Sequence, residues 1–132
     1  MAKKIFISYK SDVEDTRYKN LLVAWAANKD FDFNFNDTSV GVSINSEDAT
    51  YIKRVIKKQI EDSKIFLYLV GKNTHKSDWC NWEIEKASDA KKSFIIVKLN
   101  SDYTVDIDLY GQGANWVYSF NYEKIKEAID AC

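Results

Sequence analysis

The sequence is poor in the residues on which metal sites and nucleophilic centres are usually built. It has two cysteines and one histidine among 132 residues. Cys80 and Cys132 are too far apart to match a metal-ligand spacing, so we expect two free thiols in a reducing compartment. His75 has no serine or cysteine nucleophile pattern around it, and we expect it to be a loop residue. The sequence therefore supports neither a metal site nor Cys-His catalysis.

Long apolar runs and an excess of charge of one sign are also missing. The longest apolar run covers residues 65–71, far short of the roughly 20 residues that a membrane-spanning helix needs. The apolar run behind the basic N-terminus is too short for a signal peptide. A net charge of -1 argues against a nucleic-acid partner, because such proteins usually present a basic face. We therefore expect a cytoplasmic protein with no membrane or nucleic-acid partner.

Apolar side chains are what the chain has in quantity. Hydrophobic residues make up 45% of the sequence, an ordinary share for a globular protein. A chain of this length can bury roughly two-thirds of the surface that its unfolded form exposes. We see no internal repeat, low-complexity segment or linker, and we predict a single domain over residues 1–132.

Strand and helix patterns alternate along the chain. Residues 31–35 place Phe at every second position, which predicts an edge strand with one wet face. Residues 65–70 are apolar throughout, which predicts a central parallel strand buried on both sides. The other expected strands cover 4–9, 94–99 and 115–120, and the expected helices cover 13–28, 77–91 and 122–131, with another helix capped by Ser46.

Five such units predict an α/β fold of the flavodoxin-like, doubly wound kind. We expect a five-stranded parallel sheet in the order 2-1-3-4-5, with helices on both faces. Ligands of such sheets bind outside the carboxyl ends of the strands, at the switch point between the first and third strands. The residues expected at that switch point are Ser8, Tyr9, Lys10, Ser11, Asp37, Thr38, Gly71 and Lys72.

The sequence lacks the residues that two common functions of this fold require. A flavin or dinucleotide site needs a glycine-rich turn after the first strand, where backbone N–H groups approach the phosphate, and residues 10–13 contain no glycine. A phosphoacceptor domain would have an aspartate at the end of the third strand, where Gly71 stands.

The helix expected at residues 77–91 carries the main candidate site. Cys80, Ile84 and Ala87 follow the i, i+4, i+7 spacing of a stripe that faces the core. Trp79 and Glu83 form a second i, i+4 pair on its flank, so we expect Glu83 to be a partly desolvated carboxylate at the rim of the core. A carboxylate beside an aromatic ring suits the cleavage of an N-glycosidic bond, because it can stabilise a ribosyl cation. The alternative is that the tryptophans only pack and Glu83 is a solvated helix charge.

Three segments of the chain resemble the TIR domain family, and within it compact bacterial proteins of the Thoeris antiphage type. Residues 5–10 (IFISYK) are similar to the first strand of the family and the basic residue after it. Residues 60–65 (IEDSKI) are similar to the approach to the third strand. Residues 77–84 (SDWCNWEI) resemble the Ser-x-Trp-Cys-x-x-Glu-Leu/Ile signature of the third helix.

The resemblance implies that the chain is an NAD+-cleaving enzyme in antiphage signalling. Members with the matching glutamate break the bond between nicotinamide and ribose in NAD+, releasing ADP-ribose or a cyclic or conjugated form of it as a signal. Glu83 would be the catalytic residue, Trp79 and Tyr9 would frame the nicotinamide, and Lys10 would face the phosphates. Ser8 and Asp37 are the remaining expected substrate-binding residues.

The resemblance also implies partners. NAD+ or a related nucleotide would be the substrate, with no bound cofactor, and a separate effector protein would respond to the product. Self-association would accompany activation, and Trp82, nearly opposite the core stripe, is a candidate interface residue. Two other functions remain open: a non-catalytic TIR-like interaction module, and an enzyme like the nucleoside deoxyribosyltransferases, which use a carboxylate nucleophile on a similar sheet.

Overall fold

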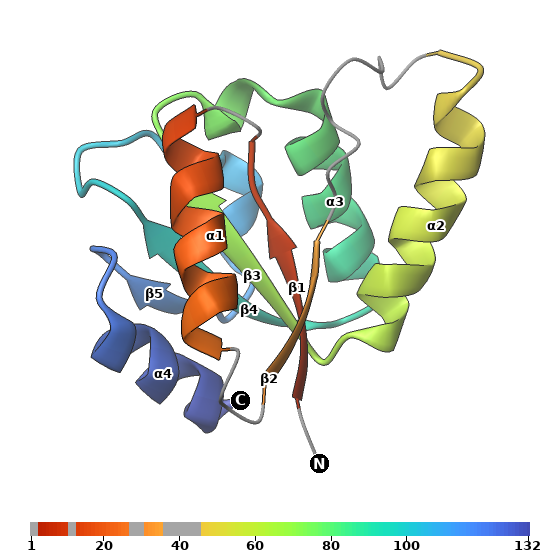
Figure 1. The fold of residues 1–132 in the computed structure, drawn as a ribbon. Coiled ribbons are helices and arrows are strands. Elements are labelled where there is room, and N and C mark those ends of the chain that lie inside the picture. The colour runs from red at the N-terminus through yellow and green to blue at the C-terminus, as the bar shows by residue number, and fades with distance from the viewer. Residues whose placement is uncertain (1–2, 11–12, 27–30, 36–45) are drawn as a thin grey trace.

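The protein has an α/β fold built on a parallel sheet, as the alternating pattern predicts (Figure 1). The computed structural model describes residues 3–10, 13–26, 31–35 and 46–132. Its elements are β1 (Lys3–Ser8), α1 (Val13–Ala26), β2 (Phe31–Phe35), α2 (Ala49–Asp62), β3 (Ile65–Val70), the 3-10 helix η1 (Thr74–Lys76), α3 (Asp78–Asp89), β4 (Ser93–Lys98), the 3-10 helix η2 (Ile107–Leu109), β5 (Asn115–Val117) and α4 (Tyr122–Ala131).

The strands lie side by side in the order β2-β1-β3-β4-β5, and each neighbouring pair is parallel. This is the order expected from the sequence. All six residues of β3 are buried, because helices cover both faces of the sheet at its centre. β2 forms one edge, as the alternating phenylalanines predict.

Two apolar layers hold the helices to the sheet. Helices α2 and α3 pack on one face, where alternate β3 residues Phe66 and Tyr68 point. Helices α1 and α4 pack on the other face, together with Leu67 and Leu69. Figure 1 shows this division, with α2 and α3 on one side of the strands and α1 and α4 on the other. Odd-numbered and even-numbered residues of the central strands therefore point into different layers.

Several helix details differ from the prediction. The apolar spacing places Leu21 on one face of α1 and Val55 in the buried stripe of α2, but the two side chains are 41% and 40% exposed, and Val55 lies on the side of α2 away from the buried Ile60. Helix α2 begins at Ala49, behind Asp48 instead of Ser46. The last strand is also shorter than expected and ends at Val117.

The end of α3 has a clear local cause. Lys91 adopts a left-handed backbone conformation with φ 56°, and the Lys92 N–H bonds back to the Ala87 carbonyl at 3.1 Å. This is the bonding pattern of a Schellman helix terminus. It stops the helix at Asp89, two residues before the end expected from the sequence. Within the described ranges, no helix has the length and apolar character needed to cross a membrane.

Candidate functional site

Ser77 fixes the start of the helix that carries the site. Its side-chain oxygen accepts a hydrogen bond from the Cys80 backbone N–H at 3.2 Å, which makes Ser77 the N-cap of α3. From this start, the core stripe expected from the sequence is buried: Cys80, Ile84 and Ala87 are at most 2% exposed. The helix is therefore held in a definite rotation over the sheet.

Glu83 is more deeply placed than the sequence indicates. It is 2% exposed, so the expectation of an only partly desolvated carboxylate at the rim of the core is wrong. The Ser8 hydroxyl donates a hydrogen bond to Glu83 Oε1 at 2.7 Å, joining residues 75 positions apart in the chain. Ser8 is the last residue of β1 and is 1% exposed. The structure thus brings together two of the expected site residues at the carboxyl end of the first strand.

The surroundings of this pair are buried and electrostatically coupled. Burial raises the pKa of the Cys80 thiol, and the nearby Glu83 carboxylate raises it further. Burial likewise raises the pKa of Tyr68, with added contributions from Cys80, Asp106 and Glu83. Tyr68 is the register partner of Ser8 on the adjacent strand. Cys80 is therefore a protonated packing residue, and a carboxylate here lies in a region of low dielectric constant.

Asp106 is a second carboxylate near this region that the sequence analysis missed. It accepts a hydrogen bond from the Tyr68 hydroxyl at 2.7 Å. Burial raises its pKa, while the bond from Tyr68 and the proximity of His75 act in the opposite direction. His75 lies in η1, and its Nδ1 atom is buried without a hydrogen-bond partner among the described atoms. Asp106 sits in a long polar loop without periodicity, so no local pattern could have identified it.

Trp79 and Trp82 pack against each other at the α2 side of α3. Trp79 is 5% exposed, and the two rings meet edge to face with centroids 5.9 Å apart. The ammonium groups of Lys53 on α2 and Lys86 on α3 lie 6.0 and 5.7 Å from the centroid of Trp82. Trp82 is therefore partly buried against the α2–α3 layer, and its role at an interface between copies stays a prediction.

The other expected substrate contacts are distributed over both faces of the sheet. Tyr9 packs in the layer of α1 and α4, with the Lys19 ammonium 5.4 Å from its ring centroid. Trp79 packs in the opposite layer, so the two rings expected to frame one ligand lie in different layers. Lys10 follows β1 and is partly exposed. Asp37 lies outside the described residues, as do Ser11 and Thr38.

A buried polar network stands at the end of β3. The Gly71 N–H donates to Thr74 Oγ1 at 2.7 Å, and the Thr74 hydroxyl donates to Asp15 Oδ2 at 2.9 Å. A methyl group on Gly71 would lie 2.1 Å from Asp15 Oδ1, which explains why glycine occupies this position. The network ties the start of α1 to the segment that leads into α3. Asp15 was missed because an acid in the first helical turn looks like an ordinary surface charge.

The arrangement is suited to electrostatic stabilisation. A buried carboxylate held by a hydroxyl can stabilise a cation that develops beside it. Among the described residues, no cluster of three His, Cys, Asp or Glu side chains could hold a metal ion. Cys80 is buried and Cys132 is partly exposed.

Solved structures of similar fold include a CMP N-glycosidase and a 2-deoxyribosyltransferase. The structure of "Clostridium botulinum CMP N-glycosidase, BcmB" has a TM-score of 0.67 and 12% identity, over 97% of this chain and 99% of that one. A conserved protein from Enterococcus faecalis V583 has a TM-score of 0.73 and 16% identity, over 99% of both chains. A 2-deoxyribosyltransferase from Bacillus psychrosaccharolyticus has a TM-score of 0.72 and 11% identity, over 92% of this chain and 90% of that one. At these identities the likeness concerns the fold alone.

The sequence itself identifies the family. A search of curated proteins finds no significant match. The family described as "Thoeris protein ThsB, TIR-like domain" matches residues 6–104, a span that includes Ser8, Trp79 and Glu83. Because this match covers well over half of the chain, the protein belongs to the family of Thoeris ThsB TIR-like domains.

Proposed function

We propose that the protein is an enzyme that cleaves NAD+ between nicotinamide and ribose and makes an ADP-ribose-type signal in bacterial antiphage defence. The observation that carries this proposal is the buried Glu83 carboxylate, held by the Ser8 hydroxyl at 2.7 Å at the carboxyl end of β1. Family membership supports the defence context. A separate effector protein would respond to the product.

The chemistry follows from the charge of the substrate. Nicotinamide is bound to ribose as a cationic pyridinium, so it leaves as a neutral ring when the electron pair of the C–N bond passes to its nitrogen. Little acid catalysis is needed, and the positive charge remains on the ribosyl group. Glu83 would stabilise this cation from a site that excludes water, where an electrostatic interaction is strong. Water then attacks the cation and loses a proton, or a hydroxyl or ring nitrogen of the same molecule closes a cycle.

The neighbouring residues take supporting roles in this proposal. The Ser8 hydroxyl fixes the orientation of the Glu83 carboxylate. The Trp79 ring packs against Trp82 and forms a wall of the layer that contains Glu83. Lys10, partly exposed just beyond β1, would attract the phosphates. Tyr9 and Asp37 remain proposed substrate contacts, and Tyr9 would act from the α1 side of the strand.

A second candidate is cleavage or transfer at the N-glycosidic bond of a nucleoside or nucleotide. Two of the similar structures are those of a CMP N-glycosidase and a 2-deoxyribosyltransferase, and each match covers at least 90% of both chains. These reactions also build positive charge on a sugar, so they would use the same carboxylate. They differ in the leaving group, because a neutral nucleobase leaves as an anion unless it is protonated.

The test is a substrate panel read by chromatography and mass spectrometry. Purified protein is incubated, at high protein concentration, with NAD+, CMP and deoxyribonucleosides in parallel. We expect release of nicotinamide from NAD+ and little change in the other substrates. Release of cytosine or base exchange without NAD+ consumption would favour the second candidate. Consumption of none of them would favour a non-catalytic interaction module.

A further inference from the structure

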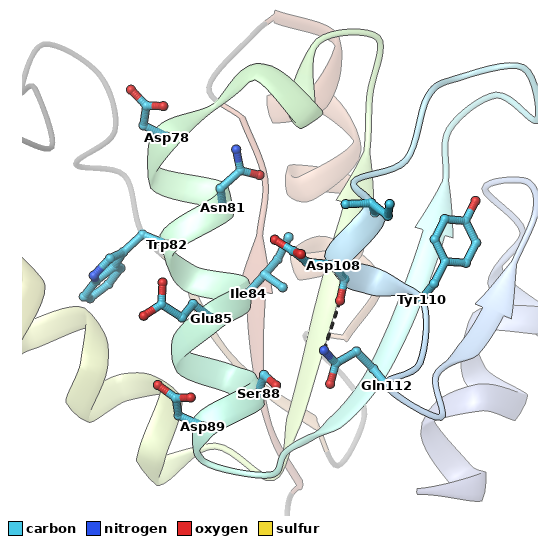
Figure 2. A pocket seen from close by; sticks show the side chains of 11 residues that line it. Asp78, Asn81, Trp82, Ile84, Glu85, Ser88, Asp89, Asp108, Tyr110 and Gln112 are labelled. Atoms are coloured by element: carbon cyan, nitrogen blue, oxygen red, sulfur yellow. Dashed lines mark hydrogen bonds between the residues drawn. The ribbon is translucent and has the colours of Figure 1, made fainter.

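A hollow of about 750 Å³ lies on the outer side of α3, facing η2 and the chain beyond it (Figure 2). Neither Glu83 nor Ser8 lines it, so it is separate from the proposed reaction site. The lining residues are Asp78, Asn81, Trp82, Ile84, Glu85, Ser88, Asp89, Ile107, Asp108, Tyr110 and Gln112, and we call this the acidic hollow. Its volume is within the range of sites that accept side chains or small ligands.

Carboxylates and exposed apolar side chains define the chemistry of the acidic hollow. Four of its eleven lining residues are acidic and none is basic. Lys86 offsets part of this charge, since its ammonium group lies 3.4 Å from Glu85 and 3.9 Å from Asp89. Ile107 and Tyr110 are 80% and 63% exposed. The hollow thus combines negative charge with apolar surface that is left in water, a combination that suits a cationic and aromatic occupant.

The outward side of α2 has the complementary chemistry. Tyr51, Arg54, Val55 and Lys58 follow the i, i+3, i+4, i+7 spacing of one helix side, opposite the buried Ile56 and Ile60. All four are exposed, and Tyr51 is 70% exposed. We call these four residues the α2 stripe. The α2 stripe thus presents a tyrosine and a valine beside two cations.

We propose that the α2 stripe of one copy docks in the acidic hollow of a second copy. Tyr51 would place its ring against Ile107 and Tyr110, and Arg54 would form paired hydrogen bonds with a carboxylate of the hollow. Tyrosine and arginine are the side chains that most often dominate binding energy at the centre of interfaces. The opposite charges would also align the two copies as they meet.

The two surfaces belong to different parts of the chain, so this contact is heterologous. Each copy has one hollow and one stripe, and each can therefore bind a neighbour on both sides. Such contacts generate a ring if the rotation closes and an open array if it does not. Self-association then depends on concentration and weakens as salt screens the charges.

The experiment uses two complementary variants of the full chain. The hollow variant, Ile107→Ser with Asp108→Asn, keeps the α2 stripe, and the stripe variant, Tyr51→Ser with Arg54→Gln, keeps the hollow. All four positions are exposed, so circular dichroism and thermal melts should match the wild type. Mass is measured by sedimentation and light scattering over a range of protein and salt concentrations. The matched control changes an exposed cation elsewhere, Lys126→Gln on α4.

The wild type and the control should form species of increasing mass as concentration rises, and they should dissociate between about 0.05 and 0.5 M salt. Each double variant alone should remain monomeric at concentrations at least about tenfold higher. An equimolar mixture of the two variants should form a dimer and stop there, since only one intact hollow and one intact stripe remain. A wild type that stays monomeric, a double variant that assembles like the wild type, or a mixture that stays monomeric would overturn the proposal. None of these readouts depends on NAD+ cleavage.

Discussion

Two carboxylates on the same helix, Glu83 and Glu85, lie in opposite environments. Glu83 is 2% exposed and accepts a 2.7 Å hydrogen bond from Ser8. The Glu85 side chain is 65% exposed, and its carboxylate lies 3.4 Å from the Lys86 ammonium. The residue type, the helix and the sequence neighbourhood are the same, so only the direction of each side chain differs.

The difference indicates which carboxylate can act on a substrate charge. An exposed ion pair such as Glu85 with Lys86 contributes about 0 to 1 kcal/mol, because water screens it. A charge in a buried site interacts several times more strongly with a second charge at the same distance. Helix α3 thus contains one buried carboxylate that is a candidate for catalysis and several exposed carboxylates that are surface charges.

Removing the charge of Glu83 should have the greatest effect. In Glu83→Gln the side chain keeps its size and an oxygen that can accept the Ser8 hydrogen bond, but it loses the charge. NAD+ turnover should fall by at least about 10²-fold, the effect of removing one electrostatic stabiliser from a dry site. Turnover is measured as nicotinamide released. The matched variant, Glu85→Gln, should retain wild-type turnover.

Stability provides the check on that comparison. Because the acceptor for Ser8 is retained, we expect Glu83→Gln to change the free energy of unfolding by no more than about 1 kcal/mol. Glu85→Gln should change it by less than about 0.5 kcal/mol. If Glu83→Gln folds normally and consumes NAD+ at the wild-type rate, the catalytic assignment is wrong and the family match extends to the fold only.

Gly71→Ala tests the buried polar network at the end of β3, and only the stability of the protein is measured. The added methyl group would lie 2.1 Å from Asp15 Oδ1, so the Asp15 side chain must shift away from Thr74. Such overpacking costs about 1 to 3 kcal/mol. The midpoint of urea unfolding, followed by tryptophan fluorescence, should fall accordingly. Ser88→Ala, at the edge of the acidic hollow, should change it by less than about 0.5 kcal/mol, and equal effects of the two variants would contradict the picture.

Ser8→Ala separates orientation from charge. Loss of the hydroxyl leaves Glu83 in place without this donor, and we expect kcat to fall about tenfold, or about 1.4 kcal/mol in the barrier, with little change in KM. Ser77→Ala is the control, because it removes the α3 cap at a cost of about 1 kcal/mol in stability without touching Glu83. If both variants lose turnover equally, Ser8 acts only through stability.

Most of the fold could be predicted because its signals are local. The apolar run of β3 and the alternation in β2 each identify one strand and its place in the sheet. Spacing alone does not decide which apolar positions of a helix are buried, and for this reason it grouped Leu21 and Val55 with the apolar residues of their helices although both are exposed. The end of α3 depends on the left-handed backbone conformation of Lys91, and a lysine in the sequence does not predict that conformation.

The candidate site could be predicted only in part. Spacing identified Trp79 and Glu83, and sheet topology identified Ser8. The depth of Glu83 depends on how closely α3 approaches β1, which no local pattern records. Applied within the strand expected at residues 4–9, the period-2 rule could have placed Tyr9 on the face of Ile5 and Ile7, away from Trp79.

Partners far apart in sequence were missed altogether. Thr74 and Asp15 are separated by 59 positions, and Tyr68 and Asp106 by 38. Each of these residues looks ordinary in its own segment. A single sequence contains no signal for such pairs, because the contact exists only after the sheet has brought the segments together.

Asp106 lies between the buried region around Glu83 and the acidic hollow on the outer side of α3. Its carboxylate accepts a hydrogen bond from the buried Tyr68, while the next two residues line the hollow. Burial raises its pKa above the ordinary value of roughly 3.9. Between the ordinary and the raised value, the folded chain holds more protons than the unfolded chain. Asp106 therefore lowers stability as pH rises through this window, and the deficit is constant above it.

Asp106→Asn removes this titration and keeps an oxygen for the Tyr68 hydroxyl. The melting temperature of the variant minus that of the wild type should therefore rise as pH increases from about 3 to 7. The change should be small, because Asp106 is only partly buried and solvent screens part of its charge. Asp108→Asn, an exposed neighbour, is the control and should show less change in this difference. A difference that instead falls with pH would mean that the Tyr68 hydrogen bond outweighs burial and lowers the pKa of Asp106. The electrostatic environment of Asp106 would then resemble that of the exposed carboxylates on the outer side of α3, and not that of the buried region around Glu83.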